Sequence, residues 1–184
     1  QKHKVFSIEL LPPQGTCTKK LLDNAIKIKN ANIDCINIPD GPRASARMSA
    51  LISAITIEQQ VKIETIPHYT CRDRNLLGIQ SDLLGAHSIG IRNMLLVTGD
   101  PPKIGYYPKA TGVFDLDAIG LTNLANSLNH GYDAAKRDLG DPLSLSIGVA
   151  VNPSPRYFDH EMKRFYWKVE AGAEWSITQP VFDS

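Results

Sequence analysis

The chain has 184 residues, of which 42% are hydrophobic and 21% charged, and its formal net charge is +1. These values are ordinary for one sizeable globular domain, and the balanced charge excludes the basic surface that nucleic acid or an anionic membrane would attract. The apolar runs have the length of strands and are too short to cross a bilayer. Three cysteines without metal-ligand spacing, Cys17, Cys35 and Cys71, predict reduced thiols in a cytoplasmic protein.

Short β-rich runs alternate with amphipathic stretches along the sequence. We expect strands at residues 4–11, 35–39, 62–70, 93–98, 144–151 and 175–182. Between them we expect helices at residues 18–30, 44–60, 74–88, 116–129 and 160–171. In the last helix, Met162, Phe165, Tyr166 and Val169 recur with helical spacing, which predicts an apolar stripe facing a sheet.

Strict alternation of strand and helix predicts a parallel sheet with right-handed crossovers. A doubly wound open sheet and a (β/α)8 TIM barrel both have this alternation. The first strand leads into Leu11-Pro12-Pro13-Gln14-Gly15 and not into a glycine-rich phosphate loop, which disfavours a dinucleotide-type open sheet. Polar residues end almost every strand, as in barrel active sites: Glu9, Asp40, His68, Asp100, Asn152 and Gln179. We therefore predict an α/β fold, a (β/α)8 TIM barrel truncated after about six strands and five helices, as a single domain over residues 1–184.

The two ends of the sequence predict a piece of a longer polypeptide. It begins at Gln1 without a methionine and ends at Ser184, directly after an apolar strand. Six strands cannot close an eight-stranded barrel, so we expect the intact protein to supply two further βα units. Without them the first and last strands would have unpaired edges, which favour association into homo-oligomers.

Glu9 is the first candidate for chemistry, because it lies in the apolar string Phe6-Ser7-Ile8-Glu9-Leu10-Leu11. Strand alternation puts it on the same face as Ser7 and Leu11, the face expected to point into the barrel. Burial among apolar neighbours would favour the protonated carboxyl, as a general acid near neutral pH requires. The alternative is a core carboxylate paired with an arginine or a lysine.

The third and fourth strands end in two further candidates. His68 could act as a ligand, a base or a hydrogen-bond donor to a cofactor, and it could equally be a structural residue. Gly99 permits close approach of the backbone, and the two prolines that follow Asp100 stiffen the turn that presents it. The alternative for Asp100 is an aspartate that caps its own turn.

The last two βα segments carry candidates for binding. Arg164 and Lys168 are four residues apart on one helix, so both can reach one face and hold a phosphate. The alternative is a solvated face with Glu161 and Glu170 as counter-charges. Gln179 offers an amide donor and acceptor together at the end of the sixth strand.

Five strings, taken together, resemble the methylenetetrahydrofolate reductases in order and spacing across essentially the whole chain. They are Ser7-Ile8-Glu9-Leu10-Leu11-Pro12-Pro13, Pro67-His68-Tyr69-Thr70-Cys71, Thr98-Gly99-Asp100-Pro101-Pro102, Lys168-Val169-Glu170-Ala171-Gly172-Ala173 and Ile177-Thr178-Gln179. The run Cys71-Arg72-Asp73-Arg74-Asn75 resembles the branch of the family that is fused to a homocysteine methyltransferase domain.

The resemblance implies a flavoprotein that uses FAD and NAD(P)H to reduce 5,10-methylenetetrahydrofolate to 5-methyltetrahydrofolate, an oxidoreductase of one-carbon metabolism and methionine biosynthesis. It implies that Glu9 is the general acid that opens the imidazolidine ring of the folate, that Asp100 lies beside flavin and pterin, and that Gln179 binds the folate. Lys168 would contact the pyrophosphate of FAD and Glu161 its ribose. The positions that the resemblance assigns to FAD are His68, Val97, Thr98, Gly99, Asp100, Ala150, Asn152, Glu161 and Lys168, and it assigns no metal.

Two other interpretations of the same residues stay open. One is a metal-dependent barrel lyase with Glu9, His68 and Asp100 as ligands, since hard metals prefer oxygen-rich sites. The other is a non-catalytic fragment that binds folate or a partner domain without turnover.

Overall fold

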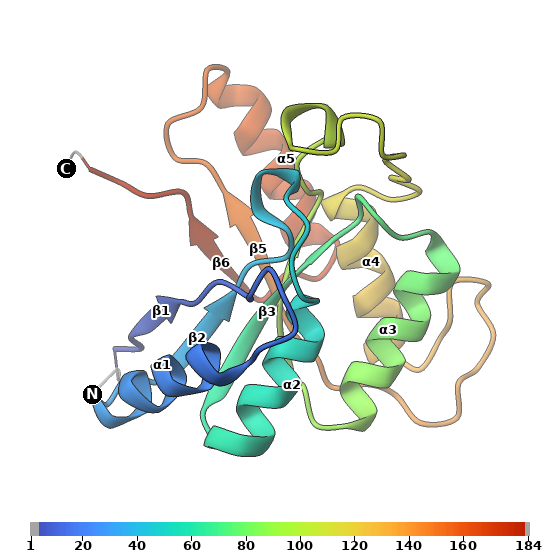
Figure 1. Cartoon of the computed structure of the whole chain (residues 1–184). Coiled ribbons are helices and arrows are strands. Elements are labelled where there is room, and N and C mark those ends of the chain that lie inside the picture. Colours follow the sequence, from blue (N-terminus) through green and yellow to red (C-terminus); the bar gives the residue numbers. More distant parts are fainter. Residues whose placement is uncertain (1–3, 183–184) are drawn as a thin grey trace. The chain divides into compact units, whose positions relative to one another are not determined.

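The computed structural model describes residues 4–182; residues 1–3 and 183–184 lie outside the described part of the chain. Within the described residues, parallel strands alternate with helices along the chain, which confirms the predicted α/β class, truncated after six strands (Figure 1). The strands are β1 (Ser7–Glu9), β2 (Cys35–Ile38), β3 (Glu64–Thr70), β4 (Asn93–Val97), β5 (Ser146–Val151) and β6 (Trp175–Thr178). The α-helices are α1 (Lys19–Asn30), α2 (Ala50–Val61), α3 (Leu76–Ser88), α4 (Ala118–Asn129) and α5 (Phe158–Glu170). Two short 3₁₀ helices, η1 (Pro42–Ala44) and η2 (Pro102–Ile104), follow β2 and β4.

The chain divides into two compact units, and each is described by itself. The first unit holds the chain up to Tyr69 together with Gly99–Thr111; the second holds Thr70–Thr98 together with the chain from Gly112 onward. The expectation of a single domain over residues 1–184 stays a prediction.

In the first unit, β1 pairs in parallel with β2, and β2 with β3. Ile36 and Ile38 of β2 are completely buried, and α2 packs both on this strand and against α1 (Figure 1). The side chains of Cys35 and Asn37 alternate with these isoleucines and therefore lie on the opposite face of the strand. The isoleucine face thus anchors the helices, and the other face carries the polar residues.

In the second unit, β4 pairs in parallel with β5, and β5 with β6. Helix α4 packs on β4, β5 and α5. Gly148 of β5 is the register partner of Trp175 of β6, and the indole ring fills the space where a side chain at Gly148 would lie. The indole Nε1 donates a hydrogen bond to the Ser146 hydroxyl at 2.9 Å, which fixes the ring in that place.

Several predicted boundaries are wrong by a few residues. Helix α2 begins at Ala50 and not at residue 44, because Arg43 and Ala44 have left-handed backbone angles and the Ser49 side chain caps the helix. Lys62 also has a left-handed conformation and ends α2, so β3 begins only at Glu64. The sixth strand ends at Thr178, four residues before the predicted end.

The predicted apolar stripe of α5 is only partly covered, with Met162 and Phe165 half-buried. Tyr166 is 55% exposed and Val169 46%, whereas Lys168, between them in sequence, is 7% exposed. The amino group of Lys168 reaches the end of β5, so the helix turns this side inward. Among the described residues no helix is long and apolar enough to cross a membrane.

Candidate functional site

The residues predicted to form the site fall into two groups, one in each compact unit. The first unit contains Glu9, His68, Gly99 and Asp100. The second contains Val97, Thr98, Ala150, Asn152, Glu161, Lys168 and Gln179. Most of these residues lie at or directly after the carboxyl ends of strands, as predicted from the sequence. Glu161 and Lys168 lie on α5.

Glu9 ends β1, and all three residues of that strand are exposed. The predicted burial of Glu9 among apolar side chains is therefore wrong for the described part of the chain, where β1 is covered on one edge by β2. Glu9 lines a pocket of about 450 Å³ together with the loop that follows β1, one side of α1 and Arg47. Lys20 and Arg47 are the cationic residues of this lining.

His68 near the end of β3 is a neutral imidazole with an unused nitrogen. Burial lowers its pKa to about 4, although the charge of Asp40 acts in the opposite direction. Its Nε2 atom is buried and has no hydrogen-bond partner among the described residues. Native proteins seldom leave such a group unpaired, so the nitrogen marks a place where a ligand or water would bind.

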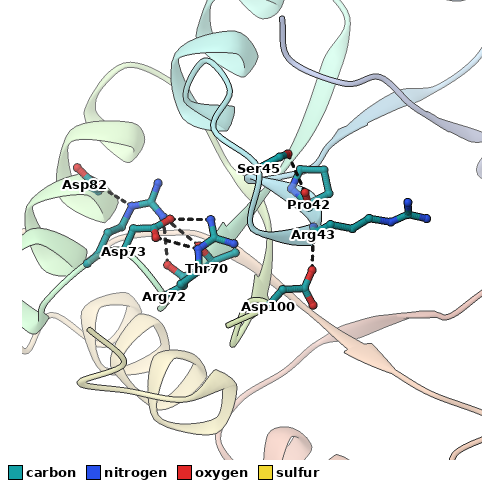
Figure 2. A network of polar contacts seen from close by, with 9 residues as sticks. Pro42, Arg43, Ser45, Thr70, Arg72, Asp73, Asp82 and Asp100 are labelled. Atoms are coloured by element: carbon teal, nitrogen blue, oxygen red, sulfur yellow. Dashed lines mark hydrogen bonds and ion pairs between the residues drawn. The ribbon is translucent and has the colours of Figure 1, made fainter. Parts of the chain in front are cut away.

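Asp100 supports a strained turn. Its carboxylate accepts a hydrogen bond from the backbone N–H of Arg43 at 2.9 Å, as Figure 2 shows. Arg43 and Ala44 have φ angles of 55° and 51°, which non-glycine residues adopt at some cost. Gly105, at the end of η2, lies against this turn, and a Cβ atom there would overlap the carbonyl oxygen of Ala44. The carboxylate predicted to face a flavin thus also holds the β2–α2 loop in place.

Four predicted residues of the second unit come together at the end of β5. The amino group of Lys168 donates a hydrogen bond to the carbonyl oxygen of Ala150 at 2.7 Å. The carboxylate of Glu161 accepts one from the backbone N–H of Asn152 at 3.1 Å. Burial lowers the pKa of Lys168, while the charge of Glu161 raises it. Helix α5 therefore brings one cation and one carboxylate to the residues that end β5.

Arg164 contacts a carboxylate of α4, and its predicted contact with a phosphate stays a prediction. Its guanidinium group pairs with the carboxylate of Asp117 at 2.8 Å, and Asp117 caps α4 by accepting from Ile119 and Gly120. Burial raises the pKa of Asp117, but the hydrogen bonds from Gly120 and Arg164 outweigh it and hold this pKa below its ordinary value. Asp117 was not among the residues predicted from the sequence, although an aspartate before an apolar helix is a recognisable N-cap.

The remaining predicted residues of the second unit form hydrogen bonds with the backbone of neighbouring segments. The hydroxyl of Thr98 accepts a hydrogen bond from the backbone N–H of Ala118 at 3.0 Å, which ties the end of β4 to α4. The carbonyl oxygen of Val97 accepts from the backbone N–H of Cys71 at 3.3 Å. Gln179 is exposed directly after β6, and its backbone N–H donates to the carbonyl oxygen of Val151 at 2.9 Å.

The run from Cys71 to Asn75 forms a structural junction between β3 and α3. Arg72 is 5% exposed and makes a bidentate contact with Asp73, at 2.8 and 2.6 Å (Figure 2). Arg74 pairs with Asp82 at 3.3 Å and donates to the carbonyl oxygen of Thr70 (Figure 2). The side chain of Asn75 caps α3. These charged residues are therefore engaged with one another and with the backbone.

The described residues contain no group of three or more His, Cys, Asp or Glu side chains placed to hold a metal ion. Glu9, His68 and Asp100, all in the first unit, accordingly do not form the ligand set that a metal-dependent lyase requires. The lyase interpretation loses its structural support.

A succession of parallel βα units with polar residues at the strand ends is typical of a TIM-barrel-like α/β fold. Comparison with known families makes the assignment specific: residues 1–184 match the family of methylenetetrahydrofolate reductases, and the chain belongs to it.

Two curated relatives show how much of the family the chain represents. It is 24% identical over 178 residues to 5,10-methylenetetrahydrofolate reductase of Buchnera aphidicola, covering 96% of this chain and 56% of the relative. It is 27% identical over 198 residues to a probable NADH-dependent methylenetetrahydrofolate reductase of Oryza sativa, covering 98% of this chain and 31% of the relative. The chain thus spans about half the length of the bacterial relative and a third of the plant one.

Two solved structures share the fold. A protein from Clostridium thermocellum, described as binding two copies of 5-methyl-5,6,7,8-tetrahydrofolic acid, matches with a TM-score of 0.66 and 15% identity, over 97% of this chain and 55% of the other. A 2,3-dimethylmalate lyase matches with a TM-score of 0.57 and 10% identity, over 95% of this chain and 56% of the other. At these identities the likeness concerns the fold alone.

Proposed function

We propose that this protein carries the flavin-binding part of a methylenetetrahydrofolate reductase, which reduces 5,10-methylenetetrahydrofolate to 5-methyltetrahydrofolate with NAD(P)H. The observation that carries the proposal is the match of the whole chain to the reductase family. The Clostridium thermocellum neighbour adds support for a folate ligand, because its description names a methylated tetrahydrofolate.

The residues present fit FAD. Lys168 brings an ammonium group to the end of β5, where it can exchange the Ala150 carbonyl for a pyrophosphate oxygen. Glu161 beside it can accept hydrogen bonds from ribose hydroxyls. The unpaired Nε2 of His68 is a buried polar atom of the kind that a bound group would satisfy. Thr98, Gly99 and Asn152 supply backbone and small polar groups at the strand ends. Bound FAD would supply the hydride acceptor for NAD(P)H and the hydride donor for the folate.

In the folate reaction, the residues of this chain would handle the substrate and its proton. Glu9 would protonate the nitrogen that leaves when the imidazolidine ring opens, because an acid at that nitrogen makes the bond easier to break. Asp100 would lie beside the pterin, and Gln179 would bind the folate through its amide. Both half-reactions would share one binding place in turn.

The assignment of Glu9 is tested by separating the two half-reactions. Glu9→Gln should leave the reduction of bound flavin by NAD(P)H unchanged and abolish reoxidation of the flavin by methylenetetrahydrofolate, because the amide cannot donate an acidic proton. Stopped-flow absorbance at the flavin band measures both. Glu170→Gln, at an exposed carboxylate at the end of α5, is the matched control and should change neither rate. Equal loss of both half-reactions in Glu9→Gln would reject the role.

FAD binding is tested independently of turnover. The visible spectrum of the purified protein, before and after addition of FAD, should show a flavin band shifted by binding. Lys168→Met keeps the apolar stem of the side chain and removes the ammonium group, so it should weaken FAD binding at least tenfold. An unshifted spectrum at saturating FAD would remove the cofactor assignment.

A second function, folate binding without turnover, is favoured by the Clostridium thermocellum neighbour, whose description names binding alone. It predicts that 5-methyltetrahydrofolate binds while NAD(P)H reduces no flavin. Fusion of the intact protein to a homocysteine methyltransferase domain, its cytoplasmic location and its homo-oligomerisation remain proposals, the fusion being supported by the run from Cys71 to Asn75.

A further inference from the structure

Asn37 in β2 has a buried polar atom without a partner. Asn37 is 7% exposed, and the Oδ1 atom of its side chain has no hydrogen-bond partner among the described residues. The amide nitrogen of the same side chain is not among the buried atoms left unpaired, so the oxygen is the group left over. A buried amide oxygen without a donor destabilises the folded chain, and such an atom in a native structure requires an explanation.

The register of the sheet makes Asn37 the neighbour of the proposed acid, Glu9. Glu9 and Asn37 are direct partners in the parallel pairing of β1 with β2, so their side chains point to the same face of the sheet. Neighbouring strands are about 4.8 Å apart, a separation that a glutamate side chain spans by rotation about its own bonds. Glu9 is exposed, so its side chain has room to change rotamer.

We propose that Asn37 is a positioning residue for Glu9, whose protonated carboxyl donates a hydrogen bond to the Asn37 amide oxygen; the proposal rests on the reductase function proposed above. An amide oxygen only accepts, and of the two forms of a carboxyl group only the protonated one donates. The contact therefore stabilises the acid form of Glu9, which is the form that protonates the folate. It also fixes the carboxyl group in one orientation before the substrate binds.

The other titratable groups on the face of Glu9 and Asn37 come from the neighbouring strands. The titratable groups on the same face of the neighbouring strands are Cys35, Glu64 and His68, with Asp40 directly after β2. Burial lowers the pKa of His68, so this residue adds no positive charge near neutral pH. Asn37 thus offers Glu9 an uncharged hydrogen-bond acceptor on this face.

The test is the pH dependence of flavin reoxidation by methylenetetrahydrofolate, measured by stopped flow in Asn37→Leu, a variant of similar volume without an acceptor. We expect the basic limb of the rate profile to move about one pH unit lower, so that the rate above this limb falls about tenfold. Reduction of the flavin by NAD(P)H should keep its rate. Asn37→Ser, whose hydroxyl is a shorter acceptor, should recover part of the shift and serves if Asn37→Leu folds poorly.

Ser53→Ala is the matched control, because the Ser53 hydroxyl in α2 is another buried atom without a partner in the described chain. It should leave the profile unchanged. An unmoved pH profile in both Asn37 variants, or an equal loss in both half-reactions, would overturn the role of Asn37 while the reductase function stands. If the unsubstituted protein reduces its flavin with NAD(P)H but methylenetetrahydrofolate does not reoxidise it, the proposed function fails, and the role of Asn37 fails with it.

Discussion

Replacing Gly148 by alanine should destabilise the second unit through one identifiable contact. A Cβ atom at this position would lie nearer than 3.0 Å to three ring atoms of Trp175, closer than real Cβ atoms come. Neither the strand nor the ring can yield easily, because Gly148 and Trp175 are register partners and the indole is held by Ser146. The substitution must therefore displace the ring.

The expected cost follows from what the displacement breaks. Overpacking of a filled site costs about 1–3 kcal/mol. Loss of the hydrogen bond from the indole to Ser146 adds about 1 kcal/mol. The lower chain entropy of alanine in the unfolded state returns about 0.4–1 kcal/mol. The net loss in the free energy of unfolding is about 1–3.6 kcal/mol, measured by urea denaturation followed by circular dichroism.

A matched glycine separates overpacking from a general effect of alanine. A Cβ atom at Gly85 in α3 would have open space around it, with no neighbouring atom within 4 Å, so Gly85→Ala should stabilise the protein by about 0.5–1 kcal/mol. Adding Trp175→Leu to Gly148→Ala should cost less than the sum of the two single changes, because the smaller side chain makes room. If Gly148→Ala were as stable as the unsubstituted protein, the packing argument would be refuted.

Two further predictions concern pH and capping. The lowered pKa of His68 means that the unfolded state binds a proton below pH 6.5, whereas the folded state binds it only near pH 4. The stability that neutral His68 contributes is therefore fully present above pH 6.5 and declines as the pH falls toward 4. The free energy of unfolding should drop by about 2 kcal/mol between pH 7 and pH 5, and His68→Gln should lose this part of the decline; an unchanged slope would contradict it. Asp117→Ala should lower stability by about 0.5–2 kcal/mol at pH 7 through loss of the α4 cap, whereas Arg164→Met removes only a half-exposed ion pair and should cost less than about 1 kcal/mol. The pKa of Asp117 lies below its ordinary 3.8, so the difference in stability between Asp117→Ala and the unsubstituted protein should shrink as the pH falls through that lowered pKa. Thermal unfolding at pH 7 and pH 3 measures this difference. A stability difference that stays constant would count against the assignment.

The alternation of strands and helices could be predicted from the sequence because each element has its own period of apolar residues. The isoleucines of β2 are an example, because their alternation depends on few distant contacts. The element ends were less predictable. Left-handed backbone angles at Arg43, Ala44 and Lys62 decide where α2 begins and ends, and in these non-glycine residues no local pattern indicates them.

The sequence by itself determined the fold class and the positions of polar residues at the strand ends, since both follow from residue order along one segment. Its strings also carried the family resemblance. Only the tertiary structure decided what those residues contact. It placed Lys168 on the carbonyl of Ala150, gave Asp100 a role in holding the turn at Arg43, and left Glu9 exposed beside Asn37. Burial, pairing and charge depend on segments far apart in sequence, and these contacts form only when the chain has folded.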